Sequence, residues 1–133
     1  MPAHVLIVGA SGGIGLALAH RCATLPDLRD LVLCARRATT DPELLSLRDR
    51  HPGIAVRLFD LDIGDEASLA TLSAELPADV PALDLAINTT GLLHGPDLMP
   101  EKMLEQVTAS TLHAAFAVNS YGPVLLAKHL LPW

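Results

Sequence analysis

The stretch Val5-Leu6-Ile7-Val8-Gly9-Ala10-Ser11-Gly12-Gly13-Ile14-Gly15 decides the fold. Its four consecutive apolar residues end at a glycine, which is typical of a fully buried parallel strand. The small and apolar residues from Ile14 to Leu25 then predict a helix, which Pro26 ends. A buried strand, a glycine-rich turn and a helix in this order predict the first unit of an α/β protein.

The rest of the sequence continues this alternation of strands and helices. Three more apolar runs predict strands at 31–35, 54–59 and 83–88. Helices are predicted over 41–50, 65–76 and 108–131, the first with Asp41 as N-cap before Pro42 and the second with Asp65 as N-cap. A polar loop with Gly91, Gly95 and Pro96 precedes the last helix. These units predict a doubly wound parallel sheet of the Rossmann type, with helices on both faces.

The composition limits the possible partners. Half of the 133 residues are apolar and 18% are charged, which excludes a disordered tail. The net charge is −6, and aromatic residues make up only 3% of the chain. An acidic chain with so few aromatic side chains is a poor candidate for binding nucleic acid or an anionic membrane. We therefore expect a single domain over residues 1–133 that binds small molecules.

Cysteine, histidine and apolar patterns exclude other classes of site. No two histidines lie three or four residues apart and no Cys-x-x-Cys is present, so no metal site is expected. Cys22 and Cys34 fall in predicted helix and strand, which favours buried, reduced thiols over a disulfide. The apolar stretch from Val5 to Ala19 lacks a basic leading region and contains four glycines, unlike a signal peptide. No apolar run reaches membrane-spanning length, and we expect a cytoplasmic protein.

The glycine-rich turn admits two kinds of chemistry. As Gly9-x-Ser11-x-Gly13 it fits the nucleophile elbow of serine hydrolases, but no acid–histidine pair downstream has a favoured spacing. As GxxxGxG it fits phosphate binding, because Gly9, Gly13 and Gly15 allow a tight turn and a close approach to a diphosphate at the helix N-terminus. A turn that only packs remains an alternative. We favour phosphate binding.

The end of the second predicted strand indicates which dinucleotide would bind. A carboxylate there accepts a hydrogen bond from a free 2′-hydroxyl, but this chain has Cys34-Ala35-Arg36-Arg37. Arginine instead pairs with a 2′-phosphate, so NADP(H) is favoured over NAD(H). Arg36 and Arg37 are the candidates, although a solvated turn is an equal alternative for Arg37. Three other arginines, Arg48, Arg50 and Arg57, are expected to be ordinary surface charges.

These residues resemble the short-chain dehydrogenase/reductase (SDR) family. The family's glycine motif resembles the segment Val8 to Gly15, with Gly9, Ser11, Gly12, Gly13, Ile14 and Gly15 at the cofactor. The resemblance implies that Asp62 holds the adenine amine and that Ile63 packs beside the adenine ring, with Asp60 as a nearby alternative to Asp62. The family's Asn-Asn-Ala-Gly resembles Asn88-Thr89-Thr90-Gly91, which places Asn88 and Gly91 in the cofactor site. This segment and the stretch from Gly122 to His129 are similar to the C-factor-like branch of the family.

The resemblance also implies a role for Asn119. In the family such an asparagine anchors a water that relays protons to the catalytic lysine, so Asn119 is the candidate catalytic residue. Pro123 lies four residues later and has no N–H, so the Asn119 carbonyl should lose its helical partner and the helix should kink. A proline kink with only a packing role is the alternative.

The catalytic pair of the family is missing from these 133 residues. The family uses Tyr-x-x-x-Lys and a serine, but the only tyrosine is Tyr121, with leucine at position 125 and Lys128 on another helical face. The sequence therefore resembles the cofactor-binding front part of an SDR, truncated after about four strands and the long helix that carries Asn119. The whole enzyme would interconvert a carbonyl and an alcohol, whereas the chain alone is expected to be nearly inactive.

Two further expectations follow from the truncation. The fourth strand becomes an edge, and the last helix would expose Val124, Leu125, Leu126, Leu130 and Leu131, so we expect self-association into a homo-oligomer. The alternative function is a non-catalytic module that senses a dinucleotide with the same fold.

Overall fold

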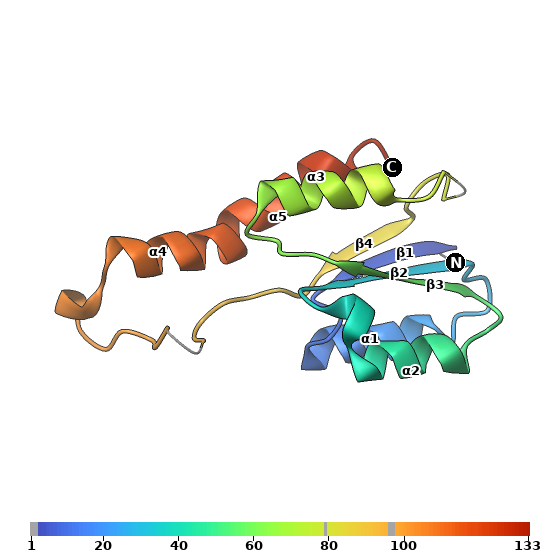
Figure 1. The fold of residues 1–133 in the computed structure, drawn as a ribbon, viewed down its shortest axis with the longest axis horizontal. Helices are drawn as coiled ribbons and strands as arrows, with labels where there is room; N and C mark the ends of the chain where they lie inside the picture. The colour runs from blue at the N-terminus through green and yellow to red at the C-terminus, as the bar shows by residue number, and fades with distance from the viewer. Residues whose placement is uncertain (1–2, 79, 96–97) are drawn as a thin grey trace.

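Four parallel strands form the centre of the molecule (Figure 1). The computed structural model describes residues 3–78, 80–95 and 98–133. The strands β1 (His4–Val8), β2 (Asp30–Ala35), β3 (Ala55–Asp60) and β4 (Leu85–Asn88) lie in the order β3-β2-β1-β4. Every pairing is parallel, which places β1 between β2 and β4. This arrangement confirms the predicted doubly wound parallel sheet.

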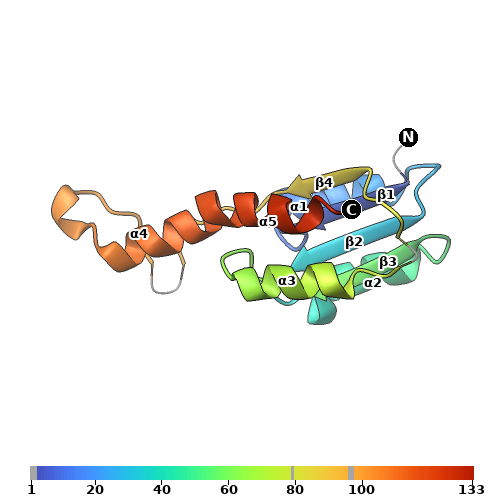
Figure 2. The ribbon, with the colours of Figure 1, turned by 90° about the horizontal axis from the view of Figure 1, so that it is seen from above.

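Helices cover both faces of the sheet, as Figures 1 and 2 show. Helices α1 (Gly13–Cys22) and α2 (Pro42–Arg50) lie on one face, and α3 (Glu66–Glu75) and α5 (Gly122–Leu130) lie on the other. Side chains alternate along β1, so Val5 and Ile7 join the core beneath α1 and α2, whereas Leu6 and Val8 join the core beneath α3 and α5. The central strands β1 and β2 are therefore buried on both faces.

The predicted helix caps are present. The Asp41 carboxylate accepts hydrogen bonds from the N–H groups of Glu43 and Leu44, and Pro42 occupies the first turn of α2. Asp65 caps α3 in the same way by accepting from the Ala67 N–H. These local contacts explain why the starts of α2 and α3 were predictable from the sequence.

Two predicted boundaries move by a few residues. Helix α1 ends at Cys22 rather than Leu25, and the Leu25 N–H donates to the Cys22 carbonyl in the turn that follows. Strand β4 begins at Leu85 rather than Leu83. The Leu83 N–H donates to the carbonyl of Trp133, so this residue bonds outside the sheet ladder.

The predicted helix over 108–131 is three consecutive segments. Thr108 caps α4 (Ala109–Phe116), a π-helical segment η3 (Ala117–Tyr121) follows, and α5 completes the run. The Gly122 N–H donates to the Ala117 carbonyl across the π turn, immediately before Pro123. Since Pro123 has no N–H, the irregularity predicted at this point takes the form of a π bulge rather than a simple kink. Helix α4 projects beyond the sheet (Figures 1 and 2).

Short 3₁₀ segments connect the larger elements. They are η1 (Ala38–Thr40), between β2 and α2, and η2 (Leu104–Gln106), before α4. The predicted loop after β4 contains an isolated bridge between Gly95 and Leu98, whereas Pro96 lies outside the described residues. No helix of the described ranges is both long and apolar enough to cross a membrane.

The predicted apolar face of the last helix is only partly exposed. Leu126 and Leu130 are buried in the core beside α3, so the prediction that they would be exposed is wrong. Val124 and Leu131 do point to solvent, at 69% and 84% exposure. Strand β4 is an edge of the four-stranded sheet, as expected, and Leu85 on it is 40% exposed.

Candidate functional site

A groove of about 330 Å³ lies at the carboxyl ends of the strands. Five chain segments line it: the end of β1 with the turn after it, the end of β2, the loop after β3, the loop after β4, and η3 through Val118. The predicted site residues among its lining are Gly9, Ser11, Gly12, Arg36, Asp62, Ile63 and Gly91. In parallel α/β sheets, ligands bind at this edge, where strand order reverses. Here the strand order reverses at β1, because β2 and β3 follow on one side of it and β4 lies on the other.

The glycines of the first turn have different structural roles. Gly9 has φ of +83°, a conformation that favours glycine, and its N–H donates to the Cys34 carbonyl over 2.9 Å. A Cβ on Gly15 would collide with the carbonyl oxygen of Gly9, so α1 packs directly against the turn. A Cβ on Gly13, by contrast, would meet no atom within 4 Å. The backbone conformation and the close packing favour glycine at positions 9 and 15, whereas the space beside Gly13 is open.

Helix α1 presents its N-terminus beside this open space. Gly12 is the N-cap and makes no side-chain cap bond, and Ser11 and Ile14 are exposed, Ile14 at 73%. Backbone N–H groups at a helix N-terminus attract anions such as a diphosphate. Among the described residues, no hydrogen bond joins Ser11 to a histidine, so the nucleophile-elbow interpretation gains no support.

Thr89 joins the end of β4 to the glycine turn, and sequence reasoning did not identify it. Its hydroxyl donates to the Val8 carbonyl at 2.9 Å and to the Gly9 carbonyl at 3.2 Å. Asn88 lies outside the groove, and its side-chain oxygen accepts from the N–H and hydroxyl of Thr90. A small hydroxyl residue directly after the fourth strand is the signal that could have indicated Thr89.

The structure separates the two candidate aspartates. Asp62 lines the groove, and its Oδ1 accepts from the Gly64 N–H at 2.9 Å. Ile63 is buried beside it. Asp60, the alternative, lies outside the groove lining, and its two oxygens accept from the N–H and the hydroxyl of Thr39. The Thr39 N–H lowers the pKa of the Asp60 carboxyl below its ordinary value.

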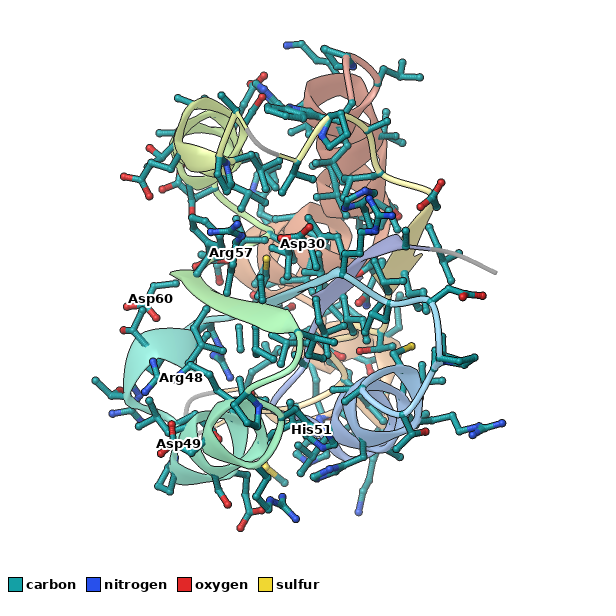
Figure 3. All side chains as sticks on the ribbon, turned by 90° about the vertical axis from the view of Figure 1, so that its right-hand side faces the viewer. Asp30, Arg48, Asp49, His51, Arg57 and Asp60 are labelled. Carbon is teal, nitrogen blue, oxygen red and sulfur yellow. The ribbon has the colours of Figure 1, made fainter. Side chains whose placement is uncertain are left out.

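The five arginines between positions 36 and 57 fall into three groups. Arg36 lines the groove, whereas Arg37 is exposed outside it and N-caps η1. Arg48 and Arg50 lie on α2 as expected, Arg48 beside Asp49 at 3.4 Å. Arg57 is not an ordinary surface charge, because its Nε donates to Asp30 at 3.2 Å and its side chain is only 29% exposed. Figure 3 shows Arg57 and Asp30 on the side of the sheet that faces α3 and α5.

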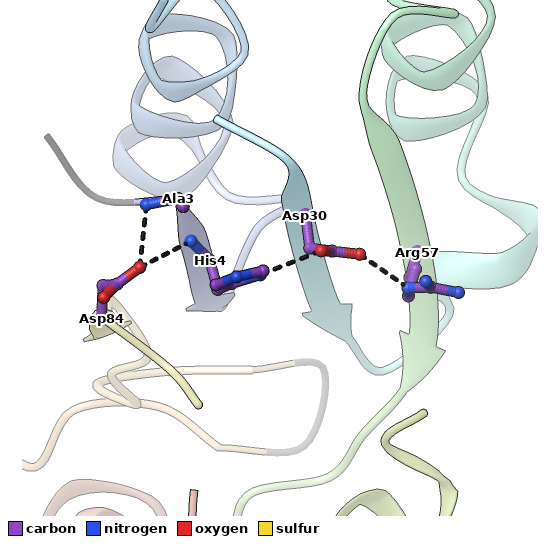
Figure 4. A network of polar contacts seen from close by, with 5 residues as sticks. All are labelled: Ala3, His4, Asp30, Arg57 and Asp84. Atoms are coloured by element: carbon purple, nitrogen blue, oxygen red, sulfur yellow. Dashed lines mark hydrogen bonds and ion pairs between the residues drawn. The ribbon is translucent and has the colours of Figure 1, made fainter. Parts of the chain in front are cut away.

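Asp30 is the centre of a polar cluster at the opposite, amino ends of the strands (Figure 4). Its carboxylate contacts the Nδ1 of His4 at 2.9 Å and the Nε of Arg57 at 3.2 Å, and the residue is 7% exposed. On the other side of His4, one oxygen of Asp84 accepts from the N–H groups of Ala3 and His4. The cluster joins the neighbouring strands β1, β2 and β3, at the end of the sheet opposite the groove. In the described part of the chain, no group of three or more histidine, cysteine, aspartate or glutamate side chains could hold a metal.

Asn119 lies beside the groove rather than in it. Its amide group makes two hydrogen bonds of 2.7 Å with the backbone of Leu92, one donated and one accepted. The side chain therefore ties the π segment to the loop after β4. Arg37, Gly13, Ile14, Gly15 and Asn88, together with Asn119, are the predicted site residues that do not line the groove.

Tyr121 and Lys128 do not form a pair. The Tyr121 ring is exposed and tilts against Phe116, with ring centroids 6.2 Å apart. Lys128 donates to Glu66 of α3 at 2.7 Å. Cys22 and Cys34 are free and buried, as expected, and burial raises the pKa of both thiols. None of these side chains offers acid–base chemistry at the groove.

Comparisons with known proteins agree on one family. The chain is 35% identical over 100 residues to an uncharacterized oxidoreductase of Mycobacterium tuberculosis, which is 74% of this chain and 39% of the relative. It is 27% identical to the NADP-dependent 3-hydroxy acid dehydrogenase of Schizosaccharomyces pombe, over 96% of this chain and 47% of that protein. The chain thus spans less than half the length of these curated relatives.

Solved structures show the same fold. The carbonyl reductase Sniffer of Drosophila melanogaster superposes with a TM-score of 0.83 at 23% identity, over 99% of this chain and 52% of that one. A metagenomic short-chain oxidoreductase in complex with NADP superposes with a TM-score of 0.76 at 26% identity, over 99% and 57% of the two chains. The family model of the short chain dehydrogenases matches residues 3–133, and this chain belongs to that family.

Proposed function

We propose that the protein is an NADP(H)-dependent oxidoreductase that interconverts a carbonyl and an alcohol, and that this chain supplies its cofactor-binding part. The observation that carries the proposal is the groove, which gathers a glycine turn, an arginine and an aspartate from three separate strand ends. The relatives add support, since one is NADP-dependent by name and one solved structure is a complex with NADP.

The residues present fit a dinucleotide. The open space beside Gly13 and the exposed N-terminus of α1 suit the diphosphate, and Gly9, Ser11, Gly12, Ile14 and Gly15 shape that approach. Asp62 and Ile63 would hold the adenine. Gly91 leaves space at the loop after β4, because a Cβ on Gly91 would approach only the Asn119 Oδ1, at 3.9 Å. Asn88 would act indirectly, by fixing Thr90. When bound, the nicotinamide supplies or accepts the hydride.

Arg36 would select the cofactor. Arg36 lines the groove, and its guanidinium would pair with a 2′-phosphate by charge-assisted hydrogen bonds, with Arg37 as a second cation nearby in the sequence. The catalytic role of Asn119 stays a proposal: its main-chain carbonyl would anchor a water, while its side chain fixes the Leu92 backbone. The C-factor-like branch and a homo-oligomeric state likewise stay predictions.

Calorimetric titration of the chain with NADPH and NADH tests the cofactor. We expect Arg36→Ala to weaken NADPH binding by about tenfold and to leave NADH binding nearly unchanged. The matched control is Arg50→Ala, because Arg50 is an exposed arginine on α2 that does not line the groove and whose Nε donates to the Ser46 carbonyl of the same helix. Equal losses for both dinucleotides would contradict the preference for NADP(H).

The coding DNA tests the enzymatic part of the proposal. An open frame that continues into a serine and Tyr-x-x-x-Lys would support a reductase. A stop codon directly after Trp133 would favour the non-catalytic dinucleotide sensor instead.

A further inference from the structure

The turn between β2 and α2 is held at a point outside the groove. Arg36 reaches the groove, but the backbone that follows it turns away through η1 (Ala38–Thr40). Ala38 is completely buried, and the next residue, Thr39, is exposed. The position of the arginines therefore depends on what fixes Ala38 and Thr39.

Asp60, the last residue of β3, fixes Thr39. Its Oδ1 accepts from the Thr39 N–H at 2.9 Å, and its Oδ2 accepts from the Thr39 hydroxyl at 2.8 Å. The neighbouring backbone is also joined, because the Leu61 N–H donates to the Ala35 carbonyl at 2.9 Å. The end of β3 thus holds the turn on both sides of Arg36.

An anchored turn matters for recognition of a phosphate by arginine. The guanidinium is a planar fork at the end of a long side chain, so its pairing with a phosphate depends on where the backbone starts. A backbone that is already ordered before binding reduces the conformational entropy lost when the side chain is immobilised. If Asp60 had no positioning role, its negative charge near this turn would only repel a phosphate.

We propose that Asp60 is a positioning residue for cofactor preference: by holding Thr39, it fixes the turn from which Arg36 reaches the 2′-phosphate. The inference rests on the proposed function. It assigns Asp60 a role distinct from adenine binding, since Asp60 does not line the groove and both of its oxygens already bind Thr39.

Two small probes test the inference without the nicotinamide half of the cofactor. Adenosine 2′,5′-bisphosphate carries the 2′-phosphate and AMP does not, so the ratio of their dissociation constants measures recognition of that phosphate alone. Thr39→Val removes the hydroxyl donor, keeps the shape of the side chain and leaves the charge of Asp60 in place. We expect this variant to reduce the preference for the bisphosphate over AMP by about threefold to tenfold. Thr39→Ser keeps a hydroxyl and should restore the wild-type ratio.

Asp60→Ala, which removes both acceptor oxygens together with the charge, separates positioning from repulsion. If Asp60 positions the turn, the ratio falls in this variant as it does in Thr39→Val, while AMP affinity stays unchanged. If its charge only repels phosphate, the ratio rises, which would overturn the inference. Thr71→Val is the matched control, because Thr71 is an exposed threonine whose hydroxyl donates within α3 to Ala67.

The outcomes distinguish the inference from the proposed function. A wild-type chain that binds both probes equally would overturn the NADP(H) preference, and the inference with it. A wild-type chain that prefers the bisphosphate, with the same ratio in Thr39→Val and Asp60→Ala, would overturn the inference alone. Circular dichroism melting curves of each variant establish that the chain is folded in the titrations.

Discussion

The carboxyl and amino ends of the same four strands differ in structure: one end carries a groove and the other a cluster of paired polar side chains. At the carboxyl ends, glycines and a helix N-terminus leave backbone groups accessible along a groove of about 330 Å³. At the amino ends, side chains pair with one another, and Asp30 contacts both His4 and Arg57 with little exposure to solvent. One end is open for a ligand, and the other is closed by a polar cluster. Substitutions at the two ends should therefore separate binding from stability.

The largest effect is expected at the glycine turn. Gly15→Ala places a Cβ against the Gly9 carbonyl oxygen, and backbone cannot yield as a flexible side chain would. We expect the free energy of unfolding to fall by about 3 kcal/mol or more, as measured by urea denaturation.

Gly13→Ala is the matched variant within the same turn. Its added Cβ meets nothing within 4 Å, so the free energy of unfolding should change by less than about 1 kcal/mol. The affinity for NADPH should nevertheless fall, because the methyl group would enter the space that the diphosphate occupies in the proposed complex. Equal destabilisation by the two substitutions would contradict this division of roles.

A smaller effect on stability is expected at the amino ends. Asp30→Asn removes the charge that His4 and Arg57 share, and it should lower the free energy of unfolding by about 2 kcal/mol. The affinity of the folded chain for NADPH should not change. Asp49→Asn provides the comparison, because the Asp49 side chain is 71% exposed and should contribute less than about 0.5 kcal/mol. A loss of NADPH affinity in Asp30→Asn would show that the two ends are coupled.

The smallest effect is expected from pH. Hydrogen bonds from the N–H groups of His4 and Ala3 lower the pKa of Asp84 below its ordinary value of 3.8. A carboxyl whose pKa is lowered on folding stabilises the native state above its unfolded pKa, and that stabilisation is lost as the pH falls through the folded pKa. We therefore expect the melting temperature to decline below about pH 4 and this decline to be shallower in Asp84→Asn. Asp27→Asn, at an exposed aspartate, is the control, and an equal change in both variants would contradict the assignment.

Local signals account for the elements that were predicted well. The caps at Asp41 and Asp65 act within three residues along the chain, and the apolar runs of β1 and β2 are buried on both faces. The boundary errors have a different origin. Strand β4 begins late because Leu83 bonds to Trp133, a residue fifty positions away in sequence whose contact no local pattern encodes.

The helix that carries Asn119 shows the same distinction. Pro123 predicts an irregularity in this helix, because the missing backbone N–H is a property of the proline alone. Its form, a π segment with the Asn119 amide bound to the backbone of Leu92, depends on a loop from another part of the chain. The exposure of the last helix was also decided by tertiary packing, since α3 covers Leu126 and Leu130.

The sequence by itself determined the order of strands and helices along the chain, the glycine turn and the strand ends that contribute to the groove. These features follow from backbone geometry, hydrophobic periodicity and short-range hydrogen bonds, all of which are local. Only the tertiary structure placed Asp62 rather than Asp60 in the groove lining, brought Arg57 into a cluster with Asp30 and His4, and joined Thr89 to the glycine turn. The partners in these contacts come from different strands, so which polar side chains meet depends on how the sheet is assembled.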